Sequence, residues 1–70
     1  MSDATLLRMA REIARNLASQ SAGDAAAATA EHLRNFWSPS MRRTLLQLVE
    51  SGSAVDSTVR DAVALLRQPR

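Results

Sequence analysis

The sequence predicts an all-α fold: one domain over residues 1–70, built as a small bundle of three to four short antiparallel helices. Helix-forming residues dominate the chain, and only two glycines and two prolines interrupt them. Apolar residues recur at helical spacing in four segments, and a bundle with short connections would bury these faces against one another. A chain of 70 residues is long enough for one such domain.

The first helix is expected over residues 3–20, with Ser2 or Asp3 accepting hydrogen bonds from the free amides of its first turn. Its apolar positions, spaced three and four residues apart, form one face: Leu6, Met9, Ala10, Ile13 and Leu17. Charged residues lie on the opposite face: Arg8, Arg11, Glu12 and Arg15.

A break at residues 19–23 (SQSAG), followed by Asp24 as a cap, places the second helix at residues 25–37. The first half of this helix is rich in alanine, and its large side chains follow in the second half: Leu33, Phe36 and Trp37. Neighbouring residues on a helix point about 100° apart, so Phe36 and Trp37 cannot both point into a thin domain. We expect Trp37 in the core and Phe36 against a partner.

The pair Ser38-Pro39 predicts a sharp junction between the second and third helices. Proline disfavours the α conformation in the residue before it and suits the first position of a new helix, with Ser38 as the cap. The third helix is expected over residues 39–51, and Gly52 is expected to end it. Its inner face consists of Met41, Leu45, Leu48 and Val49.

The fourth helix is expected over residues 57–67, with Asp56 or Ser57 as its cap and Pro69 beyond its end. Its inner face consists of Val59, Ala62, Val63 and Leu66. Leu65 falls outside this stripe and is a candidate contact with another molecule.

The side chains that catalysis and metal binding need are scarce in this chain. It has no cysteine, lysine or tyrosine, and His32 is the one histidine. Glutamates with the spacing of a general acid and base are missing, because Glu12, Glu31 and Glu50 fall on three different predicted helices. We therefore predict no catalytic, cofactor-binding or metal-binding residue.

The charge pattern and hydropathy do not favour nucleic acid or membrane as a partner. A net charge of +2 is weak, and the third helix has too few exposed polar groups to read bases. No uncharged apolar stretch approaches the roughly 20 residues that cross a bilayer. The N-terminus lacks the pattern of a signal peptide, because an acid precedes the first base and Arg8 interrupts the apolar run. We expect a soluble, cytoplasmic protein.

Residues 32–43, HLRNFWSPSMRR, join both aromatic residues to a proline corner, a methionine and paired arginines. A domain this small without disulfides or metals is marginally stable alone, so we expect a protein partner. The candidate partner-binding residues are His32, Arg34, Phe36, Trp37, Pro39, Met41, Arg42 and Arg43. Trp37 and Met41 are also expected in the core. The partner-facing role is assigned mainly to Phe36, Arg34 and Arg42, with His32 as a further candidate.

The string H-L-R-x-F-W-x-P-x-M-R in this segment resembles the delta subunit of the cytoplasmic NAD-dependent, molybdenum-containing formate dehydrogenases. The opening LLRMAREIARNLA and the string LLQLVESG, followed by a short final helix, are also similar to that family. Ser38 and Ser40 depart from the family pattern, which often has an acid and an arginine at these positions.

The resemblance implies a complex of several subunits. A large alpha subunit carries the molybdenum cofactor and iron–sulfur clusters and oxidises formate, and beta and gamma subunits pass electrons through FMN and iron–sulfur centres to NAD. The delta subunit would bind no cofactor and would stabilise or assemble the large subunit. Two alternatives stay open: a transient chaperone for cofactor insertion and, less favoured, a small DNA-binding regulator.

Overall fold

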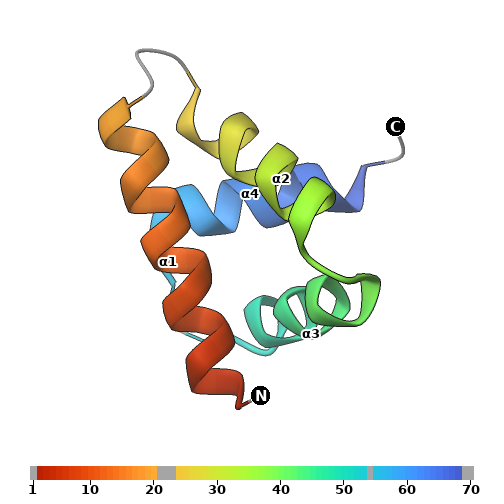
Figure 1. Ribbon diagram of the computed structural model, residues 1–70. Helices are drawn as coiled ribbons and strands as arrows, with labels where there is room; N and C mark the ends of the chain where they lie inside the picture. The colour runs from red at the N-terminus through yellow and green to blue at the C-terminus, as the bar shows by residue number, and fades with distance from the viewer. Residues whose placement is uncertain (1, 21–23, 54, 69–70) are drawn as a thin grey trace.

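The computed structural model describes residues 2–20, 24–53 and 55–68, which form four α-helices (Figure 1). These are α1 (Asp3–Gln20), α2 (Ala25–Phe36), α3 (Pro39–Glu50) and α4 (Ser57–Arg67). The predicted all-α fold class is confirmed, and α2 and α3 each end one residue before the expected position. Residues 21–23 of the expected break, and Pro69, lie outside the described residues.

Each helix begins at a side chain that accepts hydrogen bonds from first-turn amides, which have no partner within the helix. The accepting residues are Ser2 (Thr5 N, 3.1 Å), Asp24 (Ala26 N, 3.0 Å, and Ala27 N, 3.1 Å), Ser38 (Met41 N, 3.2 Å) and Asp56 (Val59 N, 2.9 Å). These local bonds fix where the helices start.

The end of α3 is fixed by Gly52, whose φ of 95° lies in the left-handed region that favours glycine. With Gly52 in this left-handed conformation, its amide donates to the Val49 carbonyl at 3.2 Å and the Ser53 amide donates to the Leu48 carbonyl at 3.0 Å. This pair of bonds is the Schellman arrangement, and it satisfies two carbonyls that the helix leaves free.

The core lies where inner faces of all four helices meet. Its buried members are Leu6, Ala10 and Ala14 of α1, Leu33 and Trp37 at the end of α2, Leu45 of α3, and Val59 and Val63 of α4. The largest fully buried side chains are leucines, Leu33 and Leu45, each 0% exposed. Ala14 is a core residue that the apolar pattern of the sequence did not include, because a single methyl group adds little to that pattern.

The helices do not pack equally against one another. α2 packs most extensively against α4, and the C-terminal ends of these two helices lie on the same side of the molecule (Figure 1). α1 crosses the other three helices along one side. By contrast, α2 and α3 pack against each other least, although the corner at Ser38 and Pro39 joins them directly. The angle at this corner therefore depends on contacts other than a shared helix interface.

Replacing Leu33 by alanine should destabilise the fold by about 2–5 kcal/mol, because the side chain is fully buried and its loss leaves a cavity. Asn35→Ala on the exposed side of the same helix is the matched control and should change stability by about 0.5 kcal/mol or less. Urea unfolding followed by far-UV circular dichroism measures both. Equal unfolding midpoints for the two variants would contradict this description of the core.

Candidate protein interaction site

The candidate segment runs from the last turns of α2, through two extended residues, into the first turn of α3. Trp37 ends α2 with φ −91° and ψ 145°, and its amide donates to the Leu33 carbonyl at 3.0 Å. Ser38 is also extended, and Pro39 occupies the start of α3 as the sequence predicts. These two extended residues turn the chain sharply between the helices.

The two adjacent aromatic residues point in different directions. Trp37 is 6% exposed and belongs to the core, whereas Phe36 is 73% exposed. Among the described residues, Phe36 is the one large hydrophobic side chain that is exposed. Both positions follow the expectation from helix geometry, and contact of Phe36 with a partner stays a prediction.

The exposed Phe36 ring lies against His32, one helical turn earlier. Their ring centroids are 4.7 Å apart and the ring planes are tilted by 40°. Aromatic pairs at this distance attract each other, so His32 restricts the orientations that Phe36 adopts. The pair presents a partly ordered apolar surface, and ordering before binding lowers the entropic cost of association.

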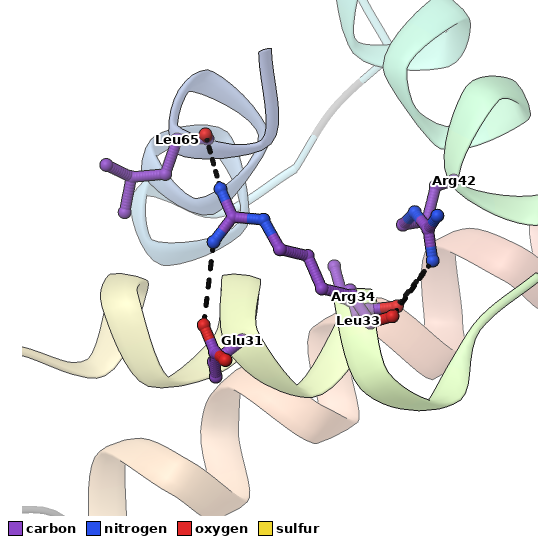
Figure 2. Close-up of polar contacts among 5 residues, drawn as sticks. All are labelled: Glu31, Leu33, Arg34, Arg42 and Leu65. Carbon is purple, nitrogen blue, oxygen red and sulfur yellow. Dashed lines mark hydrogen bonds and ion pairs between the residues drawn. The ribbon is translucent and has the colours of Figure 1, made fainter. Parts of the chain in front are cut away.

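Arg42, in the first turns of α3, reaches back to the C-terminal end of α2 (Figure 2). One guanidinium nitrogen, Nη1, donates to the carbonyls of Leu33 (3.3 Å), Arg34 (3.1 Å) and Trp37 (2.6 Å). The Arg34 and Trp37 carbonyls are among the last four of the helix, which have no partner within it, whereas the Leu33 carbonyl also accepts from the Trp37 amide. The partial negative charge at this helix end favours a cation there. Arg42 thus joins the two helices that pack least against each other.

Arg34 makes a similar contact with the end of α4 (Figure 2). Its Nη2 donates to the Leu65 carbonyl at 2.9 Å, and its Nη1 lies 3.5 Å from Oε2 of Glu31. The Gln68 amide also donates to this carbonyl, at 3.2 Å. Arg34 and Arg42 therefore bond within the chain, which the sequence did not indicate, and their part in a partner interface stays a prediction.

The other candidate residues divide between surface and core. Pro39 and Arg43 are exposed, His32 is half-buried, and Met41 is half-buried against the core. The exposed part of the candidate site consequently centres on Phe36, with the rest of the segment supporting it.

The described residues form a surface and no enclosed site. No pocket opens among them, and no three histidine or acidic side chains come together in a way that could hold a metal ion. Within the same part of the chain, no helix combines the length and apolar character that crossing a membrane requires.

A family model described as the NADH-dependent formate dehydrogenase delta subunit FdsD matches residues 5–63. The match includes the whole of α2 and α3 with the corner between them. No curated protein and no solved structure matches the chain significantly.

Arg42→Gln should lower the free energy of unfolding by about 1–3 kcal/mol, because it removes a charged donor from three helix-end carbonyls. Arg43→Gln is the matched control, since Arg43 is the exposed neighbour and its replacement should cost about 0.5 kcal/mol or less. Urea unfolding of both variants checks the difference. The role of Arg42 at the end of α2 is wrong if the two substitutions have the same effect.

Proposed function

The chain belongs to the delta-subunit family of NADH-dependent formate dehydrogenases, and on this premise we propose that it is a non-catalytic accessory subunit. In this proposal it binds the large, formate-oxidising subunit and stabilises or assembles it. The single observation that carries the proposed contact is the exposed Phe36 at the end of α2.

The environment of Phe36 supports a role in binding. Moving a phenylalanine side chain out of water stabilises a complex by about 1.5–3 kcal/mol, and the fold of this chain leaves that contribution unused. Large side chains that enter a pocket of the partner typically dominate binding energy. Phe36 is also held on a helix end that Arg42 bonds to α3, so its position is defined before the partner arrives.

The composition supports the non-catalytic part of the proposal. Iron–sulfur clusters are held by cysteine thiolates, and this chain has no cysteine. The family resemblance implies that the alpha subunit binds the molybdenum cofactor and iron–sulfur clusters, and that the beta and gamma subunits bind FMN and further clusters and transfer electrons to NAD. A cytoplasmic location of the complex is part of the same proposal and rests on the family resemblance.

Phe36→Ala should weaken binding to the large subunit about tenfold or more, because it removes the apolar anchor. The measurement is co-purification of the chain with a tagged large subunit, followed by titration of the purified partners. Arg60→Ala, an exposed substitution on α4, is the control and should bind as the wild-type chain does. Thermal unfolding of both variants checks that the fold is retained.

Three outcomes of this experiment decide between readings. Retention of Phe36→Ala at the wild-type level would show that the interface lies elsewhere. No co-purification of the wild-type chain would show that the large subunit is not the partner. A permanent subunit stays in the active enzyme at a fixed ratio. If the chain is bound to immature enzyme but is absent from active enzyme, it acts as a transient assembly chaperone instead.

A further inference from the structure

Three arginines of α1 form an exposed row on the side of the helix that faces away from the core. Arg8, Arg11 and Arg15 are all exposed, and about 10 Å along the helix axis separates the first from the last. In the part of the chain that the structure describes, the ion pairs with arginine are Arg34 with Glu31 and Arg67 with Glu50. The row therefore has no acidic partner within the described chain.

This arrangement does nothing for the stability of the isolated fold. Like charges three and four residues apart, as in Arg8 with Arg11 and Arg11 with Arg15, each destabilise a helix by about 0.2–0.5 kcal/mol. Glu12 lies four residues after Arg8 and three before Arg15, and these opposite charges offset the repulsion by a similar amount. The inner face of the same helix already supplies its packing, through residues such as Leu6 and Ala10. The three arginines therefore contribute little to the isolated fold, and their exposed guanidinium groups are available for a contact outside it.

We propose that Arg8, Arg11 and Arg15 form a second interface, which docks α1 on an acidic surface of a protein subunit of the complex. This inference rests on the proposed function, because it places the chain in that complex. The planar guanidinium binds carboxylates with two parallel hydrogen bonds and is more weakly hydrated than an ammonium group. Arginine is accordingly enriched in protein interfaces, where lysine is depleted.

Glu12 favours a protein partner over a nucleic acid. It lies within the arginine row and is exposed, so a uniformly negative phosphate backbone on this face would repel it. A protein surface with mixed charges can place carboxylates opposite the arginines and a base opposite Glu12. We therefore infer that the row binds a predominantly acidic protein surface that also carries a basic residue opposite Glu12.

The arginine row and Phe36 belong to different helices. Figure 1 shows α1 along one side of the molecule and the C-terminal end of α2 on the other. The row belongs to the exposed side of α1, and Phe36 is exposed at the end of α2. The chain would contact the complex through both helices, and the charged contact would be the more salt-sensitive one.

A charge-matched pair of variants tests the proposal. Arg11→Glu and Arg60→Glu each change the net charge by the same amount at an exposed helical position, but only the first lies in the row. The probe is the purified complex of the other formate dehydrogenase subunits, and its dissociation constant for the chain is measured at several salt concentrations. Circular dichroism checks that both variants remain helical.

Arg11→Glu should weaken binding about tenfold at low salt and flatten the salt dependence, whereas Arg60→Glu should match the wild-type chain. Phe36→Ala should weaken binding without changing the salt dependence. Equal affinities for Arg11→Glu and Arg60→Glu would overturn the second interface and leave the proposed function standing. If Phe36→Ala binds with wild-type affinity while Arg11→Glu binds more weakly, the arginine contact stands and the contact at Phe36 does not.

Two further outcomes would also overturn the inference. If the wild-type chain does not bind the other subunits at all, the proposed function and the second interface fail together. If the chain binds duplex DNA and Arg11→Glu abolishes that binding while subunit binding is unchanged, the row serves a nucleic acid.

Discussion

The hydrogen bonds from Arg42 to the end of α2 are the interaction on which the interaction site depends. α2 and α3 pack little against each other, and two extended residues join them. Arg42 bonds to three carbonyls at that junction, where the Arg34 and Trp37 carbonyls have no partner within the helix and the helix dipole also favours a cation. This contact holds the corner with Trp37 inside the core and Phe36 outside it.

The arginines of this lysine-free chain serve two physical purposes. Arg34, Arg42 and Arg67 bond within the fold and connect the ends of helices, the last through an ion pair of 2.8 Å with Glu50. A rigid guanidinium with five donors suits helix-end carbonyls and carboxylates equally well. The arginines of α1 have no such acceptor among the described residues, and this difference led us to infer a second surface.

Local features of the sequence predicted the helices well, because caps and stops act over a few residues. Asp24, Ser38 and Gly52 each take the role that their residue type favours. The opposite directions of Phe36 and Trp37 also followed from helix geometry alone. The hydrogen bonds of Arg34 and Arg42 could not be predicted, because every residue has a backbone carbonyl and the sequence does not mark which one accepts. Only the tertiary packing of α2 beside α4 brings the Leu65 carbonyl to Arg34.

Site-specific photo-cross-linking tests the central claim most directly, because it reports contact within the assembled complex. The chain would carry benzoylphenylalanine in place of Phe36 or, as a control, in place of Arg60 on α4. Our account predicts a covalent adduct between position 36 and the large formate-oxidising subunit, and little or none from position 60. An absent adduct at position 36, or equal adducts from both positions, would contradict the claim that Phe36 anchors this chain to its partner.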